Sequence, residues 1–360
     1  MKFQHKFGHS IWGNMNFSIS AFNRVATTSV VTVAVAFGPL FAAIAQAVTL
    51  NGAGATFPAP LYERYAREIK KDMPDMKINY QGIGSGGGVN QTIAGTVDFG
   101  ASDAAMTDAE IAKVKQGVIL VPTAGGAVSV VYNVPGVSDL KLSRTTLPAI
   151  FSGQITKWND PKIKADNPGV NLPDLPIKSV VRADSSGTTF IFTNHLSNIN
   201  GYFKGRIGTS KSPSWTLPNA LKGKGNPGVA ALVSRTAGSI GYVEYEYANK
   251  NKLKSAQVQN KKGEFVAPSL QSANSALASV SFPSNYRVFV GDPGQGYPIV
   301  GLTWIMVYKN YKDPAKAQAV KNFVKWVLTK GQKFNDDLNY TSIPSNVAND
   351  VINTVNSSVK

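Results

Sequence analysis

Short apolar segments alternate along the chain with segments whose apolar residues recur at the spacing of a helix. Residues 48–51 predict a strand, and Leu61, Tyr65 and Ile69 then define one face of a helix. Further strands are predicted at residues 77–81, 118–121, 127–132, 180–181, 240–243 and 300–308. Helices are predicted at residues 89–94, 107–116, 143–151, 157–165, 229–233, 272–278, 313–330 and 344–354. This alternation favours an α/β fold with mostly parallel sheets flanked by helices on both faces.

Two stretches do not follow the alternation. Residues 200–227 are rich in glycine, lysine and serine and are predicted to be irregular. Residues 252–266 predict a small hairpin with Gly263 at its tip.

One motif, Arg182-Ala-Asp-Ser-Ser-Gly-Thr-Thr189, stands between the strand at 180–181 and an apolar helical run. A helix that begins here presents unpaired N–H groups and a partial positive charge, which together favour an anion. The Arg182 guanidinium suits a tetrahedral oxyanion, and Asp184 is placed to hold it in position. The alternative is an ordinary helix cap beside a solvated arginine.

Two glycine-rich turns repeat this arrangement of strand, turn and helix. The first, residues 52–57, places Thr56 and Phe57 near a helix N-terminus, although a plain turn explains it equally well. The second, residues 82–88, contains Ser85 and formally matches the dinucleotide-binding pattern of three glycines, with an acidic residue, Asp103, about 20 residues further on. The strand before it is polar, whereas the first strand of a dinucleotide-binding fold is normally a buried apolar run. We therefore do not interpret it as a nucleotide site.

Composition narrows the possible functions. The chain has 360 residues, a formal net charge of +16 and no cysteine, which excludes disulfides, thiol nucleophiles and thiolate metal sites. The basic residues are scattered along the chain, so a nucleic-acid partner is not expected. The length suggests about two domains.

The first residues resemble a targeting segment. Residues 1–47 contain three basic residues and no acidic one, and an apolar run at 25–45 ends in small residues around Ala45 and Ala47. This pattern predicts a cleaved signal peptide and a periplasmic protein. The alternative is an uncleaved membrane anchor, which the polar residues within the run disfavour.

The equipment for catalysis is sparse. Beyond residue 47 the single histidine is His195, expected to be a solvated or capped residue, and the acidic residues do not cluster. With no second histidine and no cysteine, zinc and copper sites are not expected, nor is any cofactor. Many anion-cradling turns with few catalytic groups favour a binding protein over an enzyme.

Four segments together resemble the periplasmic phosphate-binding protein family of bacterial phosphate ABC importers. They are Asn51-Gly-Ala-Gly-Ala-Thr-Phe-Pro-Ala-Pro60, Tyr80-Gln-Gly-Ile-Gly-Ser-Gly-Gly-Gly-Val89, Thr96-Val-Asp-Phe-Gly-Ala-Ser-Asp103 and Val181-Arg-Ala-Asp-Ser-Ser-Gly-Thr188. Further likeness lies at residues 155–159 and 238–245. Each segment is weakly specific by itself, whereas the four in this order are strongly specific.

The resemblance implies a two-lobe clamshell of type II with two hinge crossovers. Residues 48–133 and 299–360 would form the first lobe, and residues 134–298 the second. The family holds phosphate in the cleft by hydrogen bonds and delivers it to the permease of an ABC transporter in the membrane. The binding residues carried over by motif are Thr56, Phe57, Ser85, Asp103, Arg182, Ser186, Gly187 and Thr188. Asp184 would orient Arg182.

Two positions depart from the family pattern. Ser185 stands where a glycine is common, and Gly86 stands where a second serine is common. Neither removes a binding residue, but the first is expected to alter the turn that carries the Gly187 N–H.

The role implied for Asp103 is to accept the proton that phosphate still carries. Sulfate has no such proton near neutral pH, so a buried carboxylate would bind the first ion and repel the second. Two alternatives remain: a receptor for another oxyanion such as sulfate, molybdate or a phosphate ester, and a secreted phosphatase.

Overall fold

The computed structural model describes residues 47–360. The predicted signal peptide therefore lies outside the described residues, apart from its last residue. Within residues 47–360, no helix combines the length and the apolar composition needed to cross a bilayer.

A mixed nine-stranded sheet connects the two lobes, with strand order β2-β1-β3-β12-β4-β8-β6-β7 and β9 pairing beside β4. The strands are β1 (Val48–Gly54), β2 (Met76–Gly82), β3 (Phe99–Ser102), β4 (Val118–Asn133), β6 (Lys178–Arg182), β7 (Leu221–Gly223), β8 (Ser239–Glu244), β9 (Lys254–Ser255) and β12 (Val300–Tyr308). The β1–β3 strands are parallel, as are β6–β8, whereas β4 and β12 run antiparallel to their partners. A second small sheet contains β5 (Lys141–Leu142), β10 (Gln257–Gln259) and β11 (Phe265–Val266).

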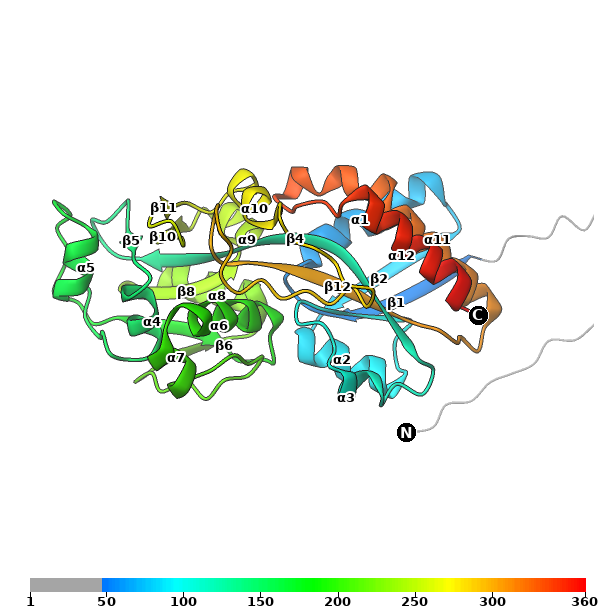
Figure 1. The fold of residues 1–360 in the computed structure, drawn as a ribbon, viewed down its shortest axis with the longest axis horizontal. Coiled ribbons are helices and arrows are strands. Elements are labelled where there is room, and N and C mark those ends of the chain that lie inside the picture. The colour runs from blue at the N-terminus through cyan, green and yellow to red at the C-terminus, as the bar shows by residue number, and fades with distance from the viewer. Residues whose placement is uncertain (1–46) are drawn as a thin grey trace, which may run out of the picture. The chain divides into compact units, whose positions relative to one another are not determined.

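The first lobe is built on β1, β2 and β3. Its helices are α1 (Ala59–Asp72), α2 (Ser85–Ala94), α3 (Asp108–Ile111), α11 (Pro314–Leu328) and α12 (Ser345–Ser358), with short 3-10 turns at Lys330–Phe334 and Asp336–Leu338. Figure 1 shows α1, α11 and α12 on one side of the strands and α2 and α3 on the other. The predicted apolar face of α1 is buried, because Leu61, Tyr65 and Ile69 are all inaccessible to solvent.

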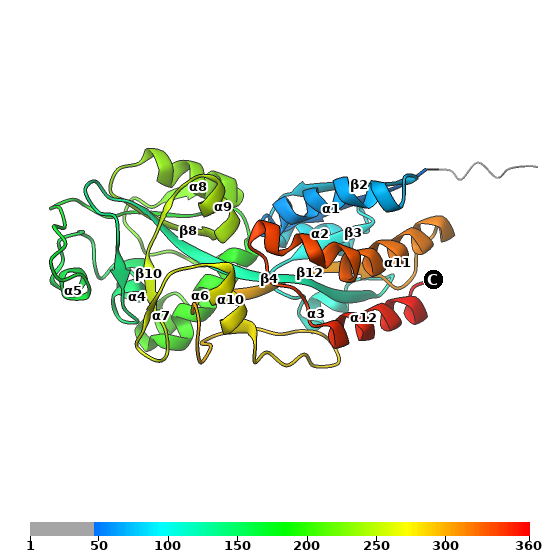
Figure 2. The ribbon, with the colours of Figure 1, turned by 90° about the horizontal axis from the view of Figure 1, so that it is seen from above.

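The second lobe is built on β6, β7 and β8. Its helices are α4 (Thr146–Phe151), α5 (Pro161–Asp166), α6 (Gly187–Ile199), α7 (Gly201–Arg206), α8 (Gly225–Arg235), α9 (Tyr245–Lys250) and α10 (Leu270–Leu277). In Figure 2, α8 and α9 lie on one side of β8, and α4, α6 and α7 lie on the other. Each lobe is therefore covered by helices on both faces of its sheet, as predicted. The residue boundaries of the lobes stay a prediction.

β4, which runs from one lobe into the other, is one continuous strand where two strands were predicted, at residues 118–121 and 127–132. β4 pairs with β12 up to Ala127 and with β8 from Val128 onward. Pro122 interrupts the apolar pattern, and it lies opposite the register shift between Thr303 and Trp304. A proline has no N–H to donate to a sheet, so a bulge accommodates it without ending the strand. Figure 1 shows β4 and β12 running side by side from one lobe into the other.

Residues 200–227 are more regular than predicted. They contain α7 and β7, and α8 already begins at Gly225. Gly225 adopts a φ of +66°, a conformation that glycine reaches without strain. The predicted helix at 107–116 is shorter than expected: the capping box of Thr107 and Glu110 is present, but α3 ends at Ile111.

Candidate functional site

The motif around Arg182 forms the second-lobe wall of the contact between the lobes. β6 ends at Arg182 and α6 begins at Gly187, so the turn between them lies at the carboxyl end of a parallel strand. The Ser186 hydroxyl accepts a hydrogen bond from the Thr189 N–H at 3.0 Å, which makes Ser186 the N-cap. Ser186, Gly187 and Thr188 are buried. The capping alternative is therefore correct for Ser186.

Arg182 is not the solvated charge of that alternative, because it is only 6% exposed. Its Nε and Nη2 donate to the two carboxylate oxygens of Asp184 at 2.9 and 2.6 Å. Burial would raise the pKa of Asp184, but the bonds and charge of Arg182 outweigh burial and hold that pKa below its usual value. The Nη1 group of Arg182 is buried without a hydrogen-bond partner among the described residues. One donor of the fork is thus left for a ligand.

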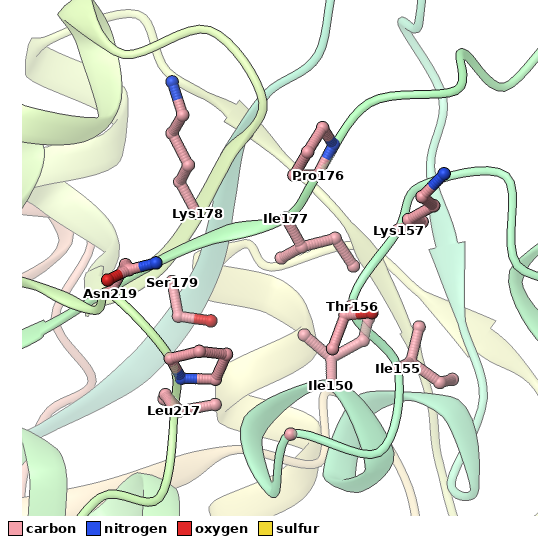
Figure 3. Close-up of a pocket in the computed structure, with 12 residues that line it drawn as sticks. Ile150, Ile155, Thr156, Lys157, Pro176, Ile177, Lys178, Ser179, Leu217 and Asn219 are labelled. Atoms are coloured by element: carbon pink, nitrogen blue, oxygen red, sulfur yellow. The ribbon is translucent and has the colours of Figure 1, made fainter.

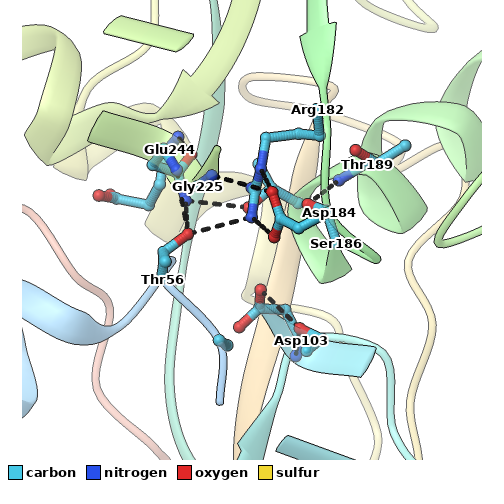
Figure 4. A network of polar contacts seen from close by, with 12 residues as sticks. Thr56, Asp103, Arg182, Asp184, Ser186, Thr189, Gly225 and Glu244 are labelled. Atoms are coloured by element: carbon cyan, nitrogen blue, oxygen red, sulfur yellow. Dashed lines mark hydrogen bonds and ion pairs between the residues drawn. The ribbon is translucent and has the colours of Figure 1, made fainter. Parts of the chain in front are cut away.

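Thr56 lies on the opposite wall, in the turn between β1 and α1 of the first lobe. Its hydroxyl oxygen accepts a bond from Arg182 Nη2 at 3.2 Å, so the two lobes touch at this point. Figure 4 shows Thr56 and Asp184 converging on the Arg182 guanidinium. Phe57 is fully buried, and its carbonyl accepts the Tyr340 hydroxyl at 2.7 Å.

Ser85 and Asp103 complete the first-lobe wall. The Asp103 N–H donates to the Ser85 hydroxyl oxygen at 3.1 Å, and both side chains are buried. A Cβ placed on Gly187 would lie 2.6 Å from a carboxylate oxygen of Asp103 and would also overlap the Ser85 hydroxyl. Only a residue without a side chain lets α6 approach Ser85 and Asp103 this closely.

Asp103 has an unusual electrostatic environment for a carboxylate. Burial raises the pKa of Asp103 to about 7, although a 2.8 Å bond from the Thr303 hydroxyl and the nearby charge of Arg182 both lower it. In Figure 4 the Asp103 side chain lies across from Arg182 and Asp184. A carboxyl group of this kind can accept or hold a proton near neutral pH.

The two departures from the family pattern face each other. The Gly86 N–H donates to the Ser185 carbonyl at 2.9 Å, and a Cβ on Gly86 would overlap the Cβ and hydroxyl of Ser185. The side chain gained at Ser185 therefore occupies the space that Gly86 leaves. Gly84, with a φ of +90°, packs in the same way against Asp184. Residues of the second lobe therefore occupy the space beside the glycines of the first-lobe loop.

The structure thus brings together all nine residues that the sequence singled out, from four separate segments. Sequence reasoning missed two further buried residues at the same place. Asn226, in the stretch assigned as irregular, bonds to Thr56 and to Thr188, and Thr303 on β12 bonds to Asp103. The glycine and proline flanking Asn226 mark a helix start, but nothing local indicates that this start reaches Thr56.

Other candidate sites carry less chemistry. A cavity of about 340 Å³ in the second lobe is walled by Ile150, Ile155 and Ile177, and Figure 3 shows Lys157 and Lys178 extending away from these apolar side chains. None of the nine residues lines it. Among residues 47–360, no group of three or more histidine, aspartate or glutamate side chains is arranged to hold a metal ion.

The expectation of a solvated or capped His195 is wrong. The side chain is fully buried on α6, and its Nδ1 lies 2.8 Å from the Gly291 carbonyl. Burial lowers the pKa of His195 to about 4, so the ring is neutral at physiological pH.

Comparisons with known proteins identify the family to which the chain belongs. Residues 42–330 match the model of the PBP superfamily domain. The phosphate-binding protein PstS of Pasteurella multocida is 43% identical over 313 residues, covering 85% of this chain and 90% of the relative. The phosphate-binding protein PstS of Haemophilus influenzae is 41% identical over 322 residues, covering 88% and 94%.

A solved structure supports the fold independently. The phosphate-binding protein from Stenotrophomonas maltophilia superposes with a TM-score of 0.71 at 20% identity, covering 85% of this chain and 93% of that one. This similarity establishes the two-lobe fold. The family model and the curated relatives show that the chain belongs to the PBP superfamily and to the family of the phosphate-binding proteins PstS.

Proposed function

We propose that this protein captures inorganic phosphate between its lobes and delivers it to an ABC importer. The binding residues would be Thr56, Phe57, Ser85, Asp103, Arg182, Ser186, Gly187 and Thr188, with Asp184 holding Arg182. The names of the curated relatives support phosphate as the ligand. They also support a binding protein rather than an enzyme.

The observation that carries the proposal is a buried guanidinium NH₂ group of Arg182 that lacks a hydrogen-bond acceptor among the described residues. The Nε and Nη2 groups of Arg182 donate to Asp184, yet its Nη1 has no partner among the described residues. A buried guanidinium N–H without an acceptor is costly, and an oxyanion bound beside it would remove that cost. The N-terminus of α6 adds backbone N–H groups and a favourable dipole on the same wall.

Asp103 supports phosphate over ions that carry no proton. Its pKa of about 7 lies in the range where phosphate itself exchanges a proton. The carboxylate and the ligand can then share one proton in a hydrogen bond. An ionised Asp103 carboxylate would meet only acceptor oxygens on sulfate, and two negative groups would be buried face to face.

Calorimetric titration of the purified protein with phosphate, arsenate and sulfate tests the proposal. We expect one phosphate per chain, competition by arsenate, which has the same shape and also keeps a proton, and little binding of sulfate. Equal affinity for phosphate and sulfate would contradict the role of Asp103. Turnover of a chromogenic phosphate ester, with or without divalent metals, would instead support the phosphatase alternative.

Delivery requires that the protein lies outside the cytoplasmic membrane, where the permease subunits can reach it. The predicted signal peptide of residues 1–47 would direct it to the periplasm. Sequencing the N-terminus of the protein recovered from the periplasm tests this, and a new N-terminus near residue 48 is the expected result.

A further inference from the structure

Asn226 is a buried residue beside the proposed site to which no role has been assigned above. It is the second residue of α8, it is fully buried, and its side chain reaches residues of both lobes. Its Nδ2 donates to the Thr56 hydroxyl oxygen at 3.0 Å and to the Thr188 hydroxyl oxygen at 3.1 Å. Thr56 belongs to the first lobe and Thr188 to the second, so one amide group bridges the cleft.

The orientation of this amide follows from its partners. The Glu244 backbone N–H, which can only donate, points at Oδ1 of Asn226 at 2.9 Å. The oxygen is therefore on the Glu244 side, and the NH₂ group faces the two threonines. Both amide hydrogens are then spent on the two hydroxyl oxygens.

The direction of the hydroxyl groups follows in turn. The Thr56 oxygen accepts from Asn226 Nδ2, from the Asn226 backbone N–H at 3.0 Å and from Arg182 Nη2 at 3.2 Å. Three donors already exceed the two lone pairs of a hydroxyl oxygen, so its hydrogen is left to donate elsewhere. The Thr188 oxygen accepts from the same amide, which leaves its hydrogen for a ligand as well.

We propose that Asn226 is a positioning residue that fixes Thr56 and Thr188 as hydrogen-bond donors toward the bound anion. This inference rests on the proposed function. An oxyanion has acceptor oxygens only, apart from its acidic proton, so a site with hydroxyls of fixed direction needs no rearrangement when the ligand binds. Free hydroxyls would bind the same anion less tightly, because they would first have to be oriented.

Two substitutions separate this role from a merely structural one. Asn226→Leu has a similar size and removes the donors without adding a charge. Asn226→Asp keeps the acceptor for the Glu244 N–H, but its second oxygen accepts where Nδ2 donated. We expect Asn226→Leu to weaken phosphate binding about 10- to 100-fold and Asn226→Asp to weaken it more, since the hydroxyls would turn toward the new carboxylate.

The decisive measurement is a cycle of variants titrated with inorganic phosphate by calorimetry. In a background with Thr56→Val and Thr188→Val, no threonine hydroxyls remain for Asn226 to orient. Adding Asn226→Leu to this background should therefore change the phosphate affinity less than about threefold. Asn167→Leu is the matched control. Asn167 is a buried asparagine whose side chain bonds to the backbone of Lys141 and Ile163 in the second lobe. The Asn167→Leu variant should have a lower melting temperature but an unchanged phosphate affinity.

The outcomes are distinguishable. If the wild type does not bind phosphate, the proposed function fails, and this inference fails with it. If the wild type binds but Asn226→Leu costs the same factor with and without the threonine hydroxyls, only the positioning role is overturned. If Asn226→Leu does not fold, the same cycle with Asn226→Ala, which also adds no charge, decides, with the melting temperature showing that each variant is folded.

Discussion

The two walls of the interlobe contact each contribute one aspartate, and the two carboxylates lie in opposite electrostatic environments. On the second-lobe wall, Asp184 accepts two bonds from Arg182 and one from the Gly225 N–H, which keep its pKa low although burial opposes this. On the first-lobe wall, burial raises the pKa of Asp103 to about 7, and its bonds come from the neutral hydroxyls of Thr303 and Ser85. One wall therefore holds a charge that is already compensated, and the other holds a group that can exchange a proton.

This difference teaches how a site can attract an anion and still examine its protonation state. The Arg182–Asp184 pair supplies directed donors with little net charge, so in the proposed site the attraction for the anion would come from hydrogen bonds and from the α6 N-terminus. In the proposed site, Asp103 would distinguish ligands that carry a proton from those that do not, because nothing nearby neutralises its carboxylate fully. The following experiments change one wall at a time.

The largest effect is expected from Arg182→Ala. Removing the arginine leaves Asp184 as a half-buried carboxylate without its partner and removes the donors from the second-lobe wall. We expect phosphate affinity to fall about 1,000-fold, or about 4 kcal/mol. Binding should persist weakly, because the α6 N-terminus remains. Calorimetry measures the change.

The matched control is Arg144→Ala, which breaks a similar bidentate pair with Asp292 at 2.8 and 2.9 Å. Arg144 is not among the proposed binding residues, so this variant should lose stability but keep its phosphate affinity. An equal loss of affinity in both variants would show that any broken ion pair weakens binding, and would contradict a specific role for Arg182.

The second prediction concerns stability and pH in the absence of phosphate. The pKa of Asp103 is about 7 in the folded protein against a usual value of 3.8, so the folded state binds the proton more tightly than the unfolded state. The stabilisation from this group is complete below about pH 4 and is lost as the pH rises through about 7, about 4 kcal/mol in total.

Asp103→Asn removes the titrating group, so the pH dependence of its stability can be compared directly with that of the wild type. In phosphate-free buffer, denaturant unfolding should show the variant gaining stability relative to the wild type between about pH 4 and about pH 7. Parallel curves for the two proteins across this range would mean that Asp103 is ionised normally in the folded state.

The third prediction concerns ligand discrimination by the same residue. Asn at position 103 can donate to sulfate as well as accept from phosphate, so the preference for phosphate over sulfate should shrink about 30-fold, or about 2 kcal/mol. Competition titrations with both ions measure the ratio. Asp108→Asn is the control, because the Asp108 side chain is 91% exposed. An unchanged ratio in Asp103→Asn would contradict the proposal that Asp103 distinguishes phosphate from sulfate.

How much of this could be predicted from the sequence depends on the range of the interactions involved. The turns that carry Thr56, Ser85 and Arg182 have local signatures, namely glycine or a capping serine between a strand and a helix, and the resemblance grouped them. The continuity of β4 could not be predicted, because Pro122 and Gly125 weaken the pattern locally while β12 and β8 supply partners from far along the chain. Asn226 was missed for the same reason. Its partners Thr56 and Thr188 lie 170 and 38 residues away.

The smallest effect is expected where the walls meet at Gly86 and Ser185. A serine at position 86 would collide with the Cβ and hydroxyl of Ser185 and displace the loop that carries Ser85. We expect Gly86→Ser to weaken phosphate binding about 10-fold, or about 1.4 kcal/mol, the range of a moderately overpacked contact. The double variant Gly86→Ser with Ser185→Gly exchanges the two side chains across the contact and should restore affinity to within about twofold. The backbone bond from the Gly86 N–H to the Ser185 carbonyl needs no particular side chain at either position. A failure of the exchange to restore binding would therefore mean that the Ser185 side chain does more than fill space.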